Sequence, residues 1–258
     1  VQVISALGIN WYLFWPWLGN STRSFCVPAL NCWTCPAAAF SCPIGAIGTS
    51  LASHIFPFYV LGLVLLFGAV AGRFWCGWVC PFGLLQDVLY KIPTYKINPP
   101  RFLGYARYVF LVGGVFLVPY VAGTTETNLF WCQYCPAGRL EAGIYAKFVE
   151  PVWPQAWRFA VIVGFVVFMI VASRGFCRIF CPLGAIFGLC NKISLWRITL
   201  EGGSCKSCGL CRKSCPVDHE VYKSPNSPEC IRCLECAGCK FDAIGHGVSL
   251  AKKNEADE

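Results

Sequence analysis

Charged residues are scarce in this chain of 258 residues, of which 13% are charged and 56% are hydrophobic. A soluble globular domain carries about a quarter charged residues, so the composition excludes an ordinary water-soluble fold. Histidine is also scarce, and His54 is the only one of three that lies before residue 196. We therefore expect no haem ligated by this chain, because a b-type haem would need two histidines in the apolar part. The sequence also lacks a Walker loop, a GxGxxG turn and an HExxH helix.

Cysteine, by contrast, is abundant, with 19 copies. Thiolates bind soft metals, so this number predicts metal centres. The formal charge of +8 is uneven: residues 1–195 carry 12 Lys and Arg against 4 Asp and Glu, whereas residues 196–258 carry 9 of each. The cations of the first part stand singly at the ends of apolar runs, which is typical of membrane topology and argues against nucleic acid as a partner.

Four apolar stretches are predicted to be transmembrane helices. At 1.5 Å per residue each reaches about 24–29 Å, close to the ~30 Å hydrocarbon core of a bilayer. Residues 1–18 lack the basic segment and the small-residue cleavage site of a signal peptide, so we expect the first stretch to be retained as a helix. The four stretches are Val3–Leu18, His54–Gly72, Leu103–Val121 and Gln155–Ala172.

The cysteine motifs recur at an offset of about 100 residues. The CxxCP motif that contains Cys35 returns at Cys135, and the CxxxCP motif that contains Cys80 returns at Cys181. Each half thus has a helix, a CxxCP loop, a second helix and a CxxxCP segment. This order predicts two parallel repeats related by a pseudo-twofold axis along the membrane normal.

Lys and Arg in the connections predict the orientation. Residues 73–102 and 173–197 hold 8 of them, against 3 in residues 19–53 and 122–154. The positive-inside rule therefore places both CxxxCP motifs and the C-terminal region in the cytoplasm of a multi-pass protein of the inner cell membrane. The expected domains are membrane repeat 1 (1–100), membrane repeat 2 (101–195), a cytoplasmic Cys-rich domain (196–247) and a short disordered tail (248–258).

The Cys-rich domain contains two cysteine runs typical of bacterial ferredoxins. In a C-x2-C-x2-C-x3-C-P run the first three cysteines bind one [4Fe-4S] cluster and the fourth binds the other. The second run has a shorter last gap and Lys240 in place of the proline, so Cys239 departs from the pattern. Zinc held by two CxxC pairs is the alternative for any one pair. The expected ligands are Cys205, Cys208, Cys211 and Cys239 for one cluster, and Cys215, Cys230, Cys233 and Cys236 for the other.

The cysteines of the apolar part form matching pairs that could hold up to two more clusters. The proline after the last cysteine of each motif suits the first turn of a helix, where the helix dipole and free amides stabilise a thiolate. We favour groups formed across the repeats, and pairing within one half is the alternative. The cross-repeat groups are Cys76, Cys80, Cys177 and Cys181 at the cytoplasmic face, and Cys32, Cys35, Cys132 and Cys135 at the exterior face.

Three cysteines remain outside these groups. Cys42 begins a CPIGAI segment that is similar to the CPLGAI segment at Cys181, so it is a candidate substitute ligand. Cys26 and Cys42 could form a disulfide or could remain two buried thiols, and both alternatives stay open. Cys190 is expected in the core.

Few polar side chains of the apolar part are candidates for a role beside the cysteines. Arg73 and Arg174 precede matching CxxxCP motifs and are expected either to donate hydrogen bonds to cluster sulfurs or to reach the lipid headgroups. Arg107 is expected to reach the headgroups rather than to bind a quinone. His54 could hydrogen-bond a quinone, although a histidine satisfied by backbone is favoured.

The order of the motifs resembles that of the membrane-bound polyferredoxins of the NapH, MauN and NosR type. That family includes haem-free quinol dehydrogenase subunits serving periplasmic nitrate reductases, and the membrane half of the nitrous oxide reductase regulator. The resemblance implies [4Fe-4S] ligation by the cysteines of the Cys-rich domain. The motifs that carry it are NCxxCP, CPIGAIG, GRFWCGWVCPFGLLQD, CQYCPAG and FCRIFCPLGAIFG, followed by the two ferredoxin runs.

We therefore expect a membrane all-α protein of four helices in two repeats, joined to a small α+β two-cluster ferredoxin-like domain. Its expected function is electron transfer as a subunit of an oxidoreductase complex. The expected partners are a cytoplasmic ferredoxin or oxidoreductase, the quinol pool in the membrane lipid, and an exterior multihaem cytochrome or second iron–sulfur protein. Whether the chain is itself an enzyme, such as a quinol dehydrogenase, stays open. A redox-sensing or metallocentre-maturation protein is the alternative.

Overall fold

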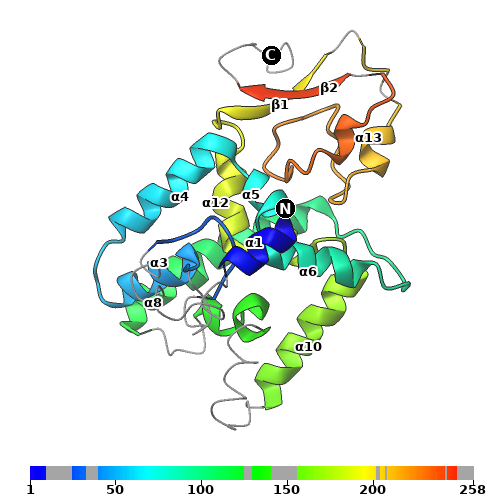
Figure 1. The fold of residues 1–258 in the computed structure, drawn as a ribbon. Coiled ribbons are helices and arrows are strands. Elements are labelled where there is room, and N and C mark those ends of the chain that lie inside the picture. The colour runs from blue at the N-terminus through cyan, green and yellow to red at the C-terminus, as the bar shows by residue number, and fades with distance from the viewer. Residues whose placement is uncertain are drawn as a thin grey trace.

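The computed structural model describes residues 1–9, 25–32, 40–124, 130–140, 156–201, 204–206, 208–241 and 243–248. Several sequence predictions fall partly or wholly outside these residues: residues 10–18 of the first apolar stretch, the first residue of the fourth stretch, Cys35, and the tail after residue 248. The described chain forms a helical part, which contains both halves of the predicted repeat, and a Cys-rich domain that lies against one end of it (Figure 1).

The helical part is built from short helices joined by tight turns. Its elements are α1 (Gln2–Ile9), α3 (Pro43–Ala52), α4 (Phe58–Ala71), α5 (Phe74–Trp78), α6 (Pro81–Tyr90), η3 (Arg101–Tyr105), α7 (Ala106–Val109), η4 (Phe110–Leu117), α8 (Val118–Ala122), η5 (Trp131–Gln133), α10 (Ala156–Val171), α11 (Gly175–Ile179) and α12 (Pro182–Cys190). Buried side chains from both halves form a single hydrophobic core.

One helix among the described residues is long and apolar enough to cross a membrane. The elements from η3 to α8 join into a continuous helix of 22 residues, Arg101–Ala122, with a π-helical segment inside it. It agrees with the predicted stretch Leu103–Val121. Helices α4 and α10 also lie where apolar stretches were predicted, but they have 14 and 16 residues, fewer than the ~20 that span a bilayer unaided. The architecture of four membrane spans stays a prediction.

Among the described residues four helical segments begin with the proline of a Cys-Pro pair, one of them at Pro136 after Cys135. Cys42, Cys80 and Cys181 are the extended residues before α3, α6 and α12. Because proline has no N–H and a fixed φ, it fits the first helical turn and ends the preceding segment. The prediction that the CxxxCP cysteines lie at helix N-termini is thus confirmed for Cys80 and Cys181. In front of α12 the Gly184 N–H donates a hydrogen bond to the Cys181 sulfur at 3.3 Å.

The Cys-rich domain has its own two-stranded sheet and its own small core. Strand β1 (Trp196–Leu200) pairs antiparallel with β2 (Ile244–Val248), with Ile198 opposite His246. The described residues between the strands include α13 (Leu210–Lys213) and the single turn η6 (Glu235–Ala237). The core side chains of this domain are Ile198, Val221, Cys230, Cys236 and Ile244. This α+β arrangement places the first and last strands side by side and leaves the cysteine loops between them.

A buried polar network attaches the Cys-rich domain to the helical part. Asn191, just after α12, donates to the carbonyls of Ser227 and Cys230 at 2.9 and 2.8 Å, and its own side-chain oxygen accepts from the Arg73 N–H. A side chain at Gly72 would collide with this asparagine, since a Cβ there would lie 2.3 Å from Asn191 Oδ1. The two parts therefore meet at a fixed position.

Candidate functional site

The first ferredoxin run and the last cysteine of the second run meet around one cavity. Their loops leave β1 and return to β2, so the sheet brings sequence-distant cysteines together. Cys208 is exposed, which places this cavity near the surface of the domain. The cysteines that line it are Cys205, Cys208, Cys211 and Cys239. The structure thus places Cys239 with the three partners that the sequence assigned to it, despite its shorter gap.

The other four cysteines of the domain line a second, more buried cavity. They are Cys215, Cys230, Cys233 and Cys236. Burial raises the pKa of the Cys230 thiol to about 11 and that of Cys236 to about 12. Thiols with such values stay protonated at neutral pH in the absence of a metal, so metal binding here must release protons.

The CxxxC cysteines of the two halves form an inner thiol group, which is made across the repeats. Its members are Cys76, Cys80, Cys177 and Cys181, and Cys181 lies within electrostatic range of the other three. All four are buried. Gln86, which the sequence argument missed, donates from Nε2 to the Cys177 sulfur at 2.9 Å.

Two buried arginines hold this inner thiol group in a reciprocal way. Arg73 Nη2 donates to the Cys177 carbonyl at 3.0 Å, and Arg174 Nη1 donates to the Cys76 carbonyl at 3.2 Å. Each arginine therefore fixes the cysteine segment of the opposite half. The expectation that they reach the headgroups is wrong, because Arg73 is 0% and Arg174 4% exposed. Asp87 forms an ion pair with Arg174 at 2.5 Å, another contact that the motifs did not reveal.

An outer thiol group gathers cysteines from the loops before α3 and around η5. Its described members are Cys32, Cys42, Cys132 and Cys135, which lie within electrostatic range of one another. Cys42, predicted only as a substitute ligand, is a full member of this group. Cys35, predicted as the fourth ligand, lies outside the described residues. No disulfide joins Cys26 and Cys42, since both thiols are free, and Cys190 is a buried free thiol as predicted.

The inner thiol group lies directly against the second cavity of the Cys-rich domain. Gly77, next to Cys76, packs on the Ile231–Cys233 backbone so closely that a Cβ there would lie 2.7 Å from the Ile231 carbonyl oxygen and 3.6 Å from Cys233 Cα. Only glycine allows this approach. Trp78 Nε1 also donates to the Arg232 carbonyl at 3.1 Å.

An aromatic layer lies beside both the inner and the outer thiol groups. The ring of Trp131, the residue before Cys132, is parallel-stacked with Phe176 and Phe180 at centroid distances of 6.4 Å and interplanar angles of 15° and 9°. These two phenylalanines precede Cys177 and Cys181. Each ring is therefore one residue from a cysteine, with Trp131 on the outer side and the phenylalanines on the inner side.

The donor set fits iron–sulfur clusters better than single metal ions. Among the described residues no three His, Cys, Asp or Glu side chains are arranged to hold one ion. Zinc would draw its thiolates together at ~2.3 Å from one centre, whereas each thiolate of a cubane binds a different iron. The two cavities of the Cys-rich domain, each lined by four cysteines, suit the second arrangement.

Comparison with known proteins agrees with this chemistry. A family described as "4Fe-4S binding domain" matches residues 53–100 and again residues 153–201. Both matched segments contain a CxxxCP motif, so the match falls on the helical part and not on the ferredoxin runs. No solved structure matches the chain significantly. The fold and sites thus define a ferredoxin-type 4Fe-4S protein.

Curated relatives extend along most of the chain. An uncharacterized protein of Methanocaldococcus jannaschii is 27% identical over 81% of this chain and 84% of its own length. The methylamine utilization ferredoxin-type protein MauN of Methylorubrum extorquens is 28% identical over 62% of this chain and 53% of MauN. The ferredoxin-type protein NapH of Haemophilus influenzae is 28% identical over 67% of this chain and 62% of NapH. These matches support the resemblance to the polyferredoxins of the NapH, MauN and NosR type that the motifs predicted.

Proposed function

We propose that this chain is an integral membrane electron-transfer subunit that carries electrons between its Cys-rich domain and the opposite face of the membrane. The observation that carries the proposal is that the described cysteines gather into four groups: two groups line the cavities of the Cys-rich domain, and the inner and outer thiol groups lie in the helical part. In the proposed arrangement, the two cavities of the Cys-rich domain would each hold a [4Fe-4S] cluster, and the inner and outer thiol groups would hold two more. When bound, the clusters supply one-electron redox chemistry.

The protein residues around the four groups suit a directed path. Exposed Cys208 marks the end at which a cytoplasmic ferredoxin or oxidoreductase would exchange electrons. Gly77 brings the inner thiol group against Cys233, and Trp131 connects it to the outer group. In the other half the positions that match Trp131 and Phe180 hold Asn31 and Val79. The position that matches Phe176 holds Trp75, and the Leu30 backbone contacts the Cys80 sulfur, so both halves bring the inner group near the outer loops; the stack of Trp131 on Phe176 and Phe180 belongs to the second half.

Composition and the helix Arg101–Ala122 support the proposed membrane placement. The outer thiol group would then serve an exterior partner, such as a multihaem cytochrome or a second iron–sulfur protein. Quinol is an alternative electron source from the lipid. The relatives MauN, a methylamine utilization ferredoxin-type protein, and NapH, a ferredoxin-type protein, support a role in electron transfer with redox partner proteins.

Sealed vesicles with the Cys-rich domain outward test the proposal. A reduced ferredoxin in the medium is expected to reduce a cytochrome trapped inside, at a rate that depends on the protein. Cys132→Ser should abolish this reduction because it removes a member of the outer thiol group. Cys190→Ser, which changes a buried cysteine outside the four groups, is the matched control and should transfer normally. Transfer by Cys132→Ser at the wild-type rate would refute the proposal.

Replacing Trp131 with leucine is expected to slow transfer between the inner and outer groups several-fold. The truncation leaves a void where rings are now in contact, and an electron tunnels less well across a gap than through packed atoms. The rate of this step would be measured from the absorbance changes of the four clusters after rapid reduction. Phe165→Leu is the control, since Phe165 contacts Phe176 and Phe180 only edge-on and adjoins no cysteine. Equal slowing in both variants would contradict the assigned path.

A further inference from the structure

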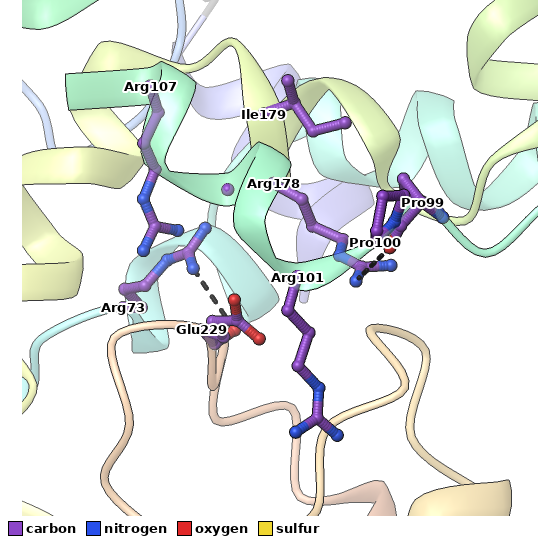
Figure 2. A pocket seen from close by; sticks show the side chains of 9 residues that line it. Arg73, Pro99, Pro100, Arg101, Arg107, Arg178, Ile179 and Glu229 are labelled. Carbon is purple, nitrogen blue, oxygen red and sulfur yellow. Dashed lines mark hydrogen bonds between the residues drawn. The ribbon is translucent and has the colours of Figure 1, made fainter. Parts of the chain in front are cut away.

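Four arginines surround a small pocket where the Cys-rich domain meets the helical part. Arg101 and Arg107 come from the helix Arg101–Ala122, Arg178 comes from α11, and Arg73 precedes α5. Glu229, in the loop before Cys230, closes the pocket from the Cys-rich domain. In Figure 2 the guanidinium groups of Arg73 and Arg107 lie next to each other, with Glu229 close to Arg73.

Three of these arginines are removed from solvent. Arg73, Arg107 and Arg178 are 0%, 3% and 7% exposed, so the expectation that Arg107 reaches the headgroups is wrong. Arg73 donates to the backbone carbonyls of Pro228 and Glu229 at 2.8 and 3.2 Å. Burying like charges side by side is unfavourable unless something of opposite charge lies between them.

The buried guanidinium groups still have N–H donors without an acceptor. Arg107 Nη2 donates only to the neighbouring Tyr108 hydroxyl at 3.2 Å, and Arg178 Nη2 to the Pro99 carbonyl at 3.4 Å. Arg73 Nε, Arg107 Nε and Arg178 Nη1 have no partner among the described residues. None of the three arginines forms an ion pair within the described part of the chain, although Glu229 lines the same pocket.

The pocket therefore has an excess of positive charge, free donors and little room. Three buried cations line the pocket with the single carboxylate of Glu229, while the Cys76 sulfur and Asp218 act on Arg73 and Arg178 from outside the pocket. The space between them is about the size of a single water molecule, which is too small for a tetrahedral oxyanion such as phosphate or sulfate. We propose that this pocket binds one monatomic anion of the chloride class, held by Arg73, Arg107 and Arg178.

The position of the pocket gives the anion a structural consequence. Arg73 contacts both the Cys177 carbonyl of the inner thiol group and the loop that leads to Cys230. An anion that neutralises Arg73 and Arg107 would relieve their repulsion where the two parts of the protein are joined. Halide binding should thus strengthen the attachment of the Cys-rich domain.

Bromide and chloride are the probes that test the site in the purified full chain. At constant ionic strength, both should raise the thermal unfolding midpoint saturably relative to gluconate, while sulfate should not. Crystals grown with bromide should show one anomalous peak among the three arginines. Arg107→Met should raise the halide concentration at half-saturation at least several-fold. Arg212→Gln, which breaks an exposed ion pair elsewhere, should leave this concentration unchanged.

Two results would overturn the assignment. Equal stabilisation by every salt would mean general screening and no site. Absence of a bromide peak in the wild-type crystal would mean that the excess charge is balanced without an anion, and this readout does not depend on any variant folding. Neither result bears on the vesicle experiment, because the pocket is argued from the arginines alone.

Discussion

Replacing Arg232 with methionine is expected to lower the free energy of unfolding by about 3 kcal/mol. Arg232 is 0% exposed and lies between the cysteines Cys230 and Cys233. Its guanidinium group donates to acceptors on both parts of the protein: the carbonyls of Ala71, Asn191 and Trp196, the Ser194 hydroxyl and the Asn226 side chain. Methionine fills a similar volume but leaves these acceptors without a donor.

Two opposing effects decide the size of this loss. Burial lowers the pKa of Arg232 to about 10, which shows that keeping the charge inside has a cost that methionine would remove. The loss of bonds from a charged donor, each worth about 1.5–3 kcal/mol, outweighs that gain. Chemical unfolding followed by tryptophan fluorescence measures the difference. Arg212→Gln removes an exposed ion pair with Asp218 and should change stability little, so equal losses in the two variants would contradict the role of Arg232.

Replacing Cys177 with serine is expected to remove one cluster and to stop electron transfer beyond the Cys-rich domain. Cys177 is buried in the inner thiol group, where Arg73 holds its carbonyl and Gln86 its sulfur. Serine is a poor ligand for iron, so three thiols would remain around a site that needs four. Iron per chain should fall by about a quarter, and the vesicle assay should lose its signal.

The same variant should leave the two clusters of the Cys-rich domain intact. Their cysteines line separate cavities, and the domain has its own core. Electron paramagnetic resonance after stepwise reduction should therefore retain two interacting signals. Unchanged iron content in Cys177→Ser would contradict the assignment of a cluster to the inner thiol group, and Cys190→Ser is again the control.

The grouping of the cysteines follows from sequence because it depends on spacing and repetition. The ferredoxin runs place Cys239 and Cys215 in opposite cavities, and the offset of about 100 residues pairs the CxxxC motifs across the halves. The position of Cys80 and Cys181 at helix N-termini follows from the proline after each of them. These are local rules, so no knowledge of the fold is needed to apply them.

Other features of the sites depend on contacts that no local pattern reveals. Arg73 and Arg174 were expected beside sulfurs or headgroups, and Arg73 does hydrogen-bond the Cys76 sulfur, but each arginine also bonds a backbone carbonyl of the opposite half, which the motifs did not reveal. Gln86 and Asp87 follow the second motif closely, but their partners lie 91 and 87 residues away. The burial of Arg107 reverses a rule for arginines near helix ends, because the Cys-rich domain covers the position that lipid headgroups would otherwise occupy.

The central claim is that the helical part holds clusters in addition to those of the Cys-rich domain. The most direct measurement is iron and acid-labile sulfide per chain on anaerobically purified wild-type protein. Four thiol groups with one [4Fe-4S] cluster each predict about sixteen irons per chain. About eight would confine the clusters to the Cys-rich domain, contradict the transmembrane path, and leave the inner and outer thiol groups as structural or sensing sites.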